Sequence, residues 1–217
     1  MKSMQKLGGI GGFAAAATFV IGLAMFATMF FDYATATDPE EVIAVLLDNQ
    51  VPLYIWNTII LIVFGIVLVP FTLALRDRLG NGPLTRVATV FGLIWSGVII
   101  AAGMISNITS GVVVDLHATD PEQATTVWIA LEAVRNGLGG GNEVLGAVWV
   151  LLLSAAALAA RVFPRWLNFL GLGLGVAGLA TVVPSLDFMG AVFGLGLVVW
   201  FTRVAMSLVR EPMPSAA

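Results

Sequence analysis

The chain lacks cysteine and carries a single histidine, His117. Without cysteine it forms no disulfide, thiolate metal site or iron–sulfur cluster, and it has no thiol nucleophile. One histidine excludes a haem held by two histidines of this chain. No lysine lies within an apolar run, which excludes a retinal Schiff base. We therefore expect no cofactor and no metal site, and no catalytic set of side chains stands out.

Charged residues are also scarce. They make up 11% of the 217 residues, whereas soluble domains carry about 25%. Hydrophobic residues make up 59%, so a soluble fold would have too little polar surface to cover its core. The net charge of −3 gives no basis for attraction to nucleic acid, and we expect no such partner. The composition instead predicts that the partner is the lipid bilayer.

Six apolar runs approach the roughly 20 residues that a helix needs to cross a bilayer. The first run is longer than the roughly 7–15 residues of a signal-peptide core, so we expect it to be retained despite the small residues at 34–36. The sequence predicts an all-α fold, with residues 1–217 forming a single polytopic bundle of six transmembrane helices. The predicted spans are residues 7–31, 52–75, 87–114, 144–160, 166–183 and 188–209.

Basic and acidic residues separate between alternate connecting segments. Nine of the ten basic residues lie on one side, and only Arg135 lies on the other. Because cytoplasmic segments of membrane proteins are enriched in lysine and arginine, this predicts a multi-pass protein of the inner (plasma) membrane with both termini cytoplasmic. The nine are Lys2, Lys6, Arg76, Arg78, Arg86, Arg161, Arg165, Arg203 and Arg210, and the opposite segments hold Asp32, Asp38, Glu40, Glu41, Asp48, Asp115, Asp120, Glu122 and Asp187.

The pentapeptide at residues 36–40, Ala-Thr-Asp-Pro-Glu, recurs at residues 118–122, which is 118 − 36 = 82 residues later. Each copy has the features of a helix start, with aspartate as N-cap, proline at the first position and glutamate in the first turn. The helices that follow are expected at 39–49 and 121–138, both amphipathic and lying on the outer face. Two explanations stay open: duplication of a unit, or a helix-start motif that arose twice.

Polar residues gather around the start of the fourth span. Glu132 and Arg135 are three positions apart on a helix and are expected to pair. Asn142 is expected to cap the fourth span, and Glu143 to lie at its positive end. With Asn136, these residues form a candidate polar cluster at the outer mouth. It is either a pocket for an ion, a headgroup or a polar solute, or a capped helix with an interfacial salt bridge.

Further polar residues lie in the outer halves of the second and third spans. They are either part of the same mouth or interhelical hydrogen-bonding groups. Pro70 is expected to bend the second span. Trp95 and Trp149 are expected to pack between helices, whereas Trp200 is expected near an interface. The outer-half residues are Asn57, Ser106, Asn107, Thr109 and Ser110.

Glycines in the last two spans occur at the spacing of close helix packing. Gly171 and Gly175 form one GxxxG pattern, and Gly190 and Gly194 form another. They allow helix backbones to approach within the chain, or against another membrane protein or a second copy in a homodimer. The GxGxxG match at 173–178 is no dinucleotide site, because it lies inside a span with no strand before it.

The motif Gly-Gly-Gly-Asn-Glu at 139–143, Trp149, and Phe-Pro-Arg-Trp-Leu at 163–167 leading to Gly171 are similar to those of a bacterial membrane family. The family is named domain of unknown function 4386, and the resemblance covers most of the chain. It implies a helical bundle in a bacterial inner membrane. It carries no catalytic residue over to this sequence.

Three functional hypotheses follow. The first is a non-enzymatic integral membrane protein, either an accessory or scaffold subunit or a module that binds a small molecule or lipid. The second is a small transporter or channel with a polar outer mouth. The third, a membrane enzyme acting on a lipid, lacks a catalytic constellation. The sequence leaves the ligand, the oligomeric state and the pathway open.

Overall fold

The computed structural model describes residues 2–31, 36–140 and 143–210, and within these ranges the chain is helical without a strand. The predicted all-α class is confirmed. The elements are α1 (Lys2–Met29), α3 (Pro39–Asp48), α4 (Gln50–Asn57), the π-helix η1 (Thr58–Val63), α5 (Phe64–Leu79), α6 (Pro83–His117), α7 (Pro121–Arg135), the π-helix η2 (Asn136–Gly140), α8 (Val144–Ala159), α9 (Arg165–Ala180), the 3₁₀ turn η3 (Pro184–Leu186) and α10 (Met189–Arg210).

Four helical segments in the described part are long and apolar enough to cross a membrane: Ser3–Met29, Gln50–Leu79, Pro83–His117 and Met189–Arg210. They correspond to four of the six expected spans. α8 and α9 have 16 residues each. At about 1.5 Å per residue each is about 24 Å long, which is shorter than a hydrocarbon core of about 30 Å.

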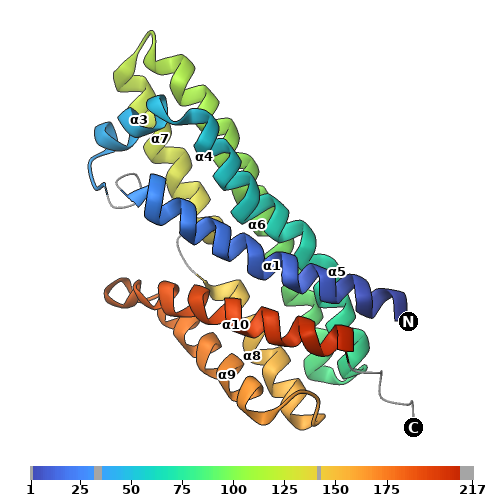
Figure 1. Ribbon diagram of the computed structural model, residues 1–217. Coiled ribbons are helices and arrows are strands. Elements are labelled where there is room, and N and C mark those ends of the chain that lie inside the picture. The colour runs from blue at the N-terminus through green and yellow to red at the C-terminus, as the bar shows by residue number, and fades with distance from the viewer. Residues whose placement is uncertain (1, 32–35, 141–142, 211–217) are drawn as a thin grey trace.

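The six long helical segments form a closed ring. α1 packs against α5 and α10, α5 against α6, α6 against α8, α8 against α9, and α9 against α10 (Figure 1). Short connections join the consecutive neighbours α5–α6, α8–α9 and α9–α10. The ring therefore has a common interior to which every one of these helices contributes.

Aromatic side chains fill the centre of this interior. The Trp149 ring lies 5.6 Å from the Trp95 ring and 5.7 Å from the Trp200 ring, measured between centroids. Trp95 and Trp149 are buried between helices as expected. The interfacial position predicted for Trp200 is wrong, because it shares the inward face of α10 with Phe193 and Leu197 and is only 2% exposed.

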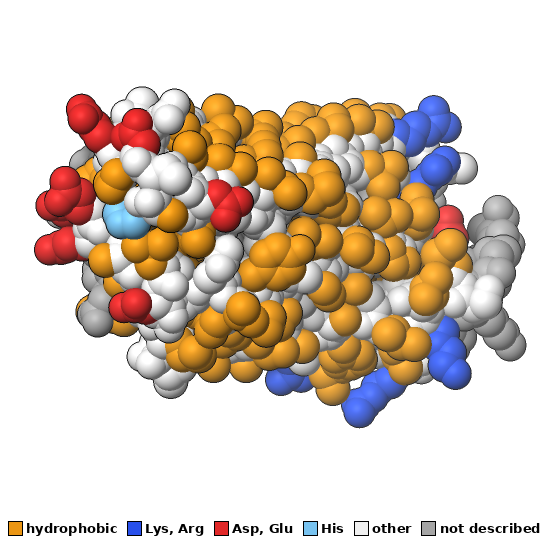
Figure 2. Space-filling model, turned by 90° about the horizontal axis from the view of Figure 1, so that it is seen from above, with side chains coloured by type: hydrophobic (Ala, Val, Ile, Leu, Met, Phe, Trp, Pro, Cys, Tyr) orange, Lys and Arg blue, Asp and Glu red, His pale blue; other side chains and the backbone are white. Residues whose placement is uncertain are grey.

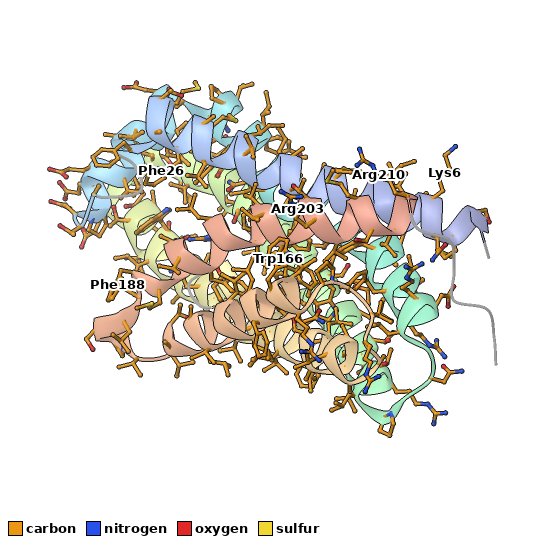
Figure 3. All side chains as sticks on the ribbon, turned by 60° about the horizontal axis from the view of Figure 1, so that its bottom comes forward. Lys6, Phe26, Trp166, Phe188, Arg203 and Arg210 are labelled. Carbon is orange, nitrogen blue, oxygen red and sulfur yellow. The ribbon has the colours of Figure 1, made fainter. Side chains whose placement is uncertain are left out.

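The outside of the ring is apolar, and its two ends carry opposite charge. Large hydrophobic side chains such as Ile66, Val176 and Leu195 are more than half exposed. Figure 2 shows hydrophobic side chains as a belt between one end with most of the visible acidic side chains and another with lysine and arginine. Lys6 and Arg210 lie together at the basic end (Figure 3). A soluble protein would not leave so wide an apolar surface exposed.

Glycines let particular helices approach closely. A Cβ on Gly171 would lie 2.0 Å from Ser154 Oγ, and one on Gly175 would lie 2.2 Å from Leu151 Cγ, so both glycines face α8. Gly190 and Gly194 make no such approach, since their nearest contacts are 3.7 Å and 3.4 Å away. The close glycine of α10 is instead Gly196, where a Cβ would lie 2.1 Å from Leu174 Cδ2.

Both copies of the repeated pentapeptide begin helices. Asp38 Oδ1 accepts the backbone N–H of Glu40 at 3.0 Å, and Asp120 Oδ1 accepts that of Gln123 at 3.0 Å. α3 and α7 contact each other at the acidic end. A second apolar cluster lies beneath them and consists of Phe30, Ile43, Leu46, Leu53, Val113 and Ala124.

The second of these helices differs from its prediction in two ways. α7 ends at Arg135, and the glycine run continues it as the π-helix η2. The apolar stripe expected along it is half-buried at Val127, Leu131 and Leu138, but Val134 is 48% exposed, and Ala124 is the one residue of α7 that is fully buried. α7 packs along α6, and this contact decides which narrow face of α7 is buried.

Candidate functional site

A cavity of about 520 Å³ lies inside the half of the bundle nearer the acidic end. α1, α4, η1, α5, α6 and α7 all contribute to its wall, and Val42 of α3 and Trp128 of α7 border it toward that end. Its floor is apolar and aromatic, its wall carries hydroxyl and amide groups, and its rim carries charge. The floor consists of Phe19, Phe64, Trp95 and Ile99, the polar wall of Asn57, Ser106, Thr109 and Ser110, and the rim of Glu132, Arg135 and Glu143.

The floor lies deep between the two ends of the bundle. Phe64 is 76 − 64 = 12 residues before Arg76, and Trp95 is 95 − 86 = 9 residues after Arg86. At about 1.5 Å per residue these positions are about 18 Å and about 14 Å from the basic end. Half of a hydrocarbon core is about 15 Å, so the floor lies near the middle of the apolar belt.

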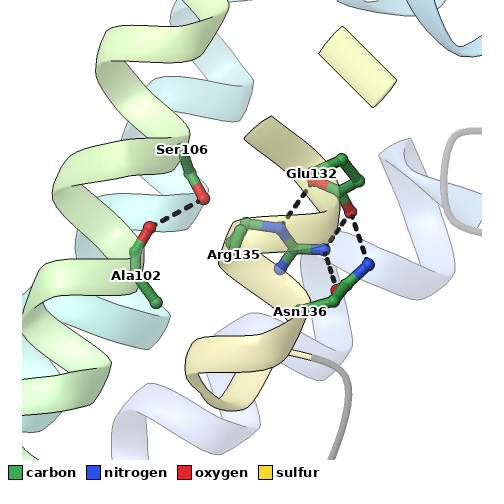
Figure 4. A network of polar contacts seen from close by, with 5 residues as sticks. All are labelled: Ala102, Ser106, Glu132, Arg135 and Asn136. Atoms are coloured by element: carbon green, nitrogen blue, oxygen red, sulfur yellow. Dashed lines mark hydrogen bonds and ion pairs between the residues drawn. The ribbon is translucent and has the colours of Figure 1, made fainter. Parts of the chain in front are cut away.

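Glu132, Arg135 and Asn136 form one polar network at the rim (Figure 4). Arg135 Nε donates to Glu132 Oε2 at 2.7 Å, and its Nη2 donates to Glu132 Oε1 and to Asn136 Oδ1. The pairing predicted from the spacing of Glu132 and Arg135 is confirmed. Because the fork of a guanidinium matches a carboxylate, this pair neutralises both charges where they face the cavity.

Glu143 stands apart from that network. Its backbone N–H donates to Thr181 Oγ1 of α9 at 3.1 Å, which ties the start of α8 to the end of α9. It occupies the N-cap position of α8, yet its carboxylate makes no capping hydrogen bond. The half-buried side chain borders the cavity, and within the described part of the chain no hydrogen bond or ion pair is made by its carboxylate.

The environment of Glu143 favours its neutral form. The start of a helix favours a negative charge, whereas removal of bulk water disfavours it. Desolvation by burial is the larger effect and raises the pKa of the Glu143 carboxyl from 4.5 to about 7. The cavity therefore holds a carboxyl group that gains or loses its proton near neutral pH.

The serine hydroxyls of the wall present acceptors to the cavity. Ser106 Oγ donates to the Ala102 carbonyl at 3.0 Å, and Ser110 Oγ donates to the Ser106 carbonyl at 2.9 Å. A carbonyl can only accept, so each hydroxyl proton is already engaged along α6. The remaining lone pairs of both oxygens are available to a donor or to positive charge.

The π-helix η1 is the part of the site that the sequence did not indicate. Within it the N–H of Phe64 reaches back to the Ile59 carbonyl, so the turn holds one residue more than an α-turn. Asn107 Nδ2 donates to Thr58 Oγ1 at 2.9 Å, which joins this wide turn to α6 as an interhelical hydrogen bond. No breaker or unusual composition marks residues 58–63, and Pro70 lies further along, inside α5.

The structure brings Glu132, Arg135, Asn136 and Glu143 to one region, and Asn142 lies outside the described residues. No group of three histidine, aspartate or glutamate side chains close enough to hold a metal ion occurs among the residues that are described. His117 is at the end of α6. The site is therefore one cavity with a carboxyl group, an ion pair and an aromatic floor.

Comparison with known proteins gives no relative from which to transfer a function: no family model, no curated protein and no solved structure matches the chain.

Proposed function

We propose that this chain is an integral membrane protein that binds a small amphiphilic molecule in the cavity on its outer side. The observation that carries the proposal is the cavity itself, which joins a charged rim to an aromatic floor halfway down the bundle. Ligand sites are concave and mostly apolar, with a few polar groups that fix orientation. Here the apolar surface is deep and the polar groups are toward one end, which matches a molecule with one polar and one apolar part.

In this proposal the apolar belt lies in the bilayer, and α8 and α9 cross it with the four longer helices. They pack in the same ring. Arg161, in the connection between them, and Arg165, the first residue of α9, lie near the basic end. The excess of lysine and arginine makes that end cytoplasmic. The acidic end, with α3 and α7 on its face, is then outside, and the cavity belongs to the outer half of the membrane.

The seam between α6 and α7 gives the ligand a route from the lipid. Ile105, Thr109 and Leu131 line both the cavity and a shallow groove on the outer surface of the bundle. Ile108, beside that groove, is 70% exposed on the apolar belt. These side chains separate the cavity from the bilayer, so an amphiphile dissolved in the outer leaflet lies next to its site.

The glycines offer less support for an accessory or scaffold subunit. Gly171 and Gly175 face α8, and Gly196 faces Leu174 of α9, so these close approaches are made within the chain. A homodimer or a partner protein bound through the glycine-rich helices stays a prediction. Membership of the family named domain of unknown function 4386 also stays a prediction.

The binding function is tested by filling the cavity. Ser106→Trp places the largest side chain in the wall, opposite the polar network that Figure 4 shows. We expect binding of neutral triphenylphosphine oxide, measured by equilibrium dialysis against protein-free micelles, to weaken by about tenfold or more because overlap with the ligand costs at least about 1.4 kcal/mol.

The matched control is Ser207→Trp, the same change at a half-buried position of α10 outside the cavity. Both variants are first checked for helical content and a single elution peak. Equal binding by the wild type and a folded Ser106→Trp variant would show that the cavity is not the site. Loss of binding in the control alone would point to the same conclusion.

A transporter is the second candidate, and buried polar atoms beneath the floor favour it. Thr72 Oγ1, Trp149 Nε1 and Ser154 Oγ have no hydrogen-bond partner within the described part of the chain. Buried polar groups are rarely unpaired, and these three lie deeper in the bundle than the cavity floor. A path across the membrane would continue through them once the aromatic core separates. Ligand-dependent flux into proteoliposomes distinguishes this candidate from binding alone.

A further inference from the structure

The two carboxylates at the cavity rim differ in whether they have a charged partner. Arg135 Nε and Nη2 both donate to the Glu132 carboxylate, and Nη2 also donates to Asn136 Oδ1. Glu143 has no such partner in the described part of the chain. An anionic ligand would meet a guanidinium that is already bound to a carboxylate. A cationic ligand would meet a carboxylate that pairs with no basic side chain among the described residues.

Uncharged groups around the cavity also favour positive charge. The hydroxyl oxygens of Ser106 and Ser110 present lone pairs, because their protons are engaged with carbonyls of α6. Aromatic rings line the lower and outer parts of the cavity, and the face of an aromatic ring attracts a cation within about 6 Å of its centre. The rings are Phe19, Phe26, Trp56, Phe64, Trp95 and Trp128.

We propose that the ligand of this cavity is an organic cation, with its positive charge beside Glu143 and its apolar body against the aromatic floor. This rests on the proposed binding function and names the class of ligand. Where the Glu143 carboxyl is protonated, it must first release its proton to solution, and the resulting carboxylate then pairs with the cation. Occupancy is therefore linked to pH, while Glu132 and Arg135, the other charged groups at the cavity, stay paired with each other.

The experiment compares two ions of nearly the same shape and opposite charge, tetraphenylphosphonium and tetraphenylborate, with neutral triphenylphosphine oxide. Specific binding is taken as the probe bound by wild type minus the probe bound by Ser106→Trp in the same micelles. This subtraction removes the contribution of probe that partitions into the detergent. At pH 8 we expect the phosphonium to bind at least about tenfold more tightly than the borate, since a desolvated ion pair is worth about 1.4 kcal/mol or more.

Glu143→Gln keeps the size of the side chain and removes its charge. We expect it to abolish the preference for the cation, and to change binding of triphenylphosphine oxide much less than binding of the phosphonium. Glu122→Gln, the same change at an exposed site in the first turn of α7, is expected to alter neither. Lowering the pH from 8 to 5 provides a second measurement on the wild type alone. Of the three probes, only the phosphonium should bind more weakly at pH 5.

Each outcome has a separate meaning. A borate affinity equal to or above that of the phosphonium, or an unchanged preference in Glu143→Gln, overturns the cation assignment. If the cation assignment fails but Ser106→Trp still weakens binding of triphenylphosphine oxide, the proposed binding function stands. Failure of all three probes to bind above the Ser106→Trp background contradicts the binding function as well.

Discussion

Replacing Gly171 by alanine is expected to destabilise the protein by about 2–3 kcal/mol, because a methyl group at this position overpacks a filled interface. The new Cβ would lie 2.0 Å from Ser154 Oγ and 2.7 Å from Trp200 Nε1. Three helices of the ring, α8, α9 and α10, meet at this point. The backbone of α9 must shift to accept the methyl group, and that shift disturbs both neighbours.

The control is Gly173→Ala, two residues further along the same helix, where a Cβ has no atom within 4 Å. Because alanine restricts the unfolded chain more than glycine does, this change is expected to be neutral or to stabilise by up to about 1 kcal/mol. The measurement is reversible unfolding in mixed dodecyl maltoside and dodecyl sulfate micelles. Equal effects at positions 171 and 173 would contradict the packing of α9 against α8.

The second large effect concerns Glu143 and depends on pH. The pKa of its carboxyl is raised from 4.5 to about 7 in the folded protein by desolvation. A group whose pKa is raised on folding stabilises the folded state fully below pH 4.5, and this contribution is lost as the pH rises toward 7. Above pH 7 the desolvated carboxylate of this half-buried side chain costs up to about 3 kcal/mol, from about 1.4 kcal/mol for each pKa unit.

Glu143→Gln is therefore expected to raise the free energy of unfolding at pH 8 by up to about 3 kcal/mol and to change it little at pH 4.5. Glutamine removes the charge and retains a polar group at the cavity. Unfolding of wild type and variant is compared across this range, with Glu122→Gln as the exposed control. A difference between Glu143→Gln and wild type that does not change with pH would show that the carboxyl does not titrate in this window.

Local features of the fold were predictable because their causes are local. The cap formed by Asp38 needs only the residues that follow it, and the pairing of Glu132 with Arg135 needs only one helical turn. The apolar runs end where charged residues begin, because charge is not tolerated inside the bilayer. The bounds of α10 therefore agree with the prediction to within one residue, and α6 extends only a few residues beyond its predicted bounds. The glycine run is an exception, since it continues α7 as η2.

Features that depend on neighbours from distant parts of the chain were not predictable. Gly190, Gly194 and Gly196 are equivalent in sequence, and only the position of Leu174 decides that Gly196 is the close contact. Trp200 was expected at an interface, and it is buried because its ring packs against Phe71 of α5 and Trp149 of α8. The cavity combines residues from Phe19 to Glu143, so the polar cluster could be located from sequence, but its aromatic floor could not.

The account depends most on the placement of the two charged ends on opposite sides of a membrane. Because the chain has no cysteine, single cysteines introduced at Asn81 and Thr119 are the only targets for a maleimide reagent. Both positions are exposed, one in the connection between α5 and α6 and the other between α6 and α7. In intact cells, a membrane-impermeant maleimide should label Thr119→Cys, and should label Asn81→Cys only after the cells are permeabilised. Labelling of Asn81→Cys in intact cells, with Thr119→Cys protected, would reverse the orientation and place the cavity on the cytoplasmic side.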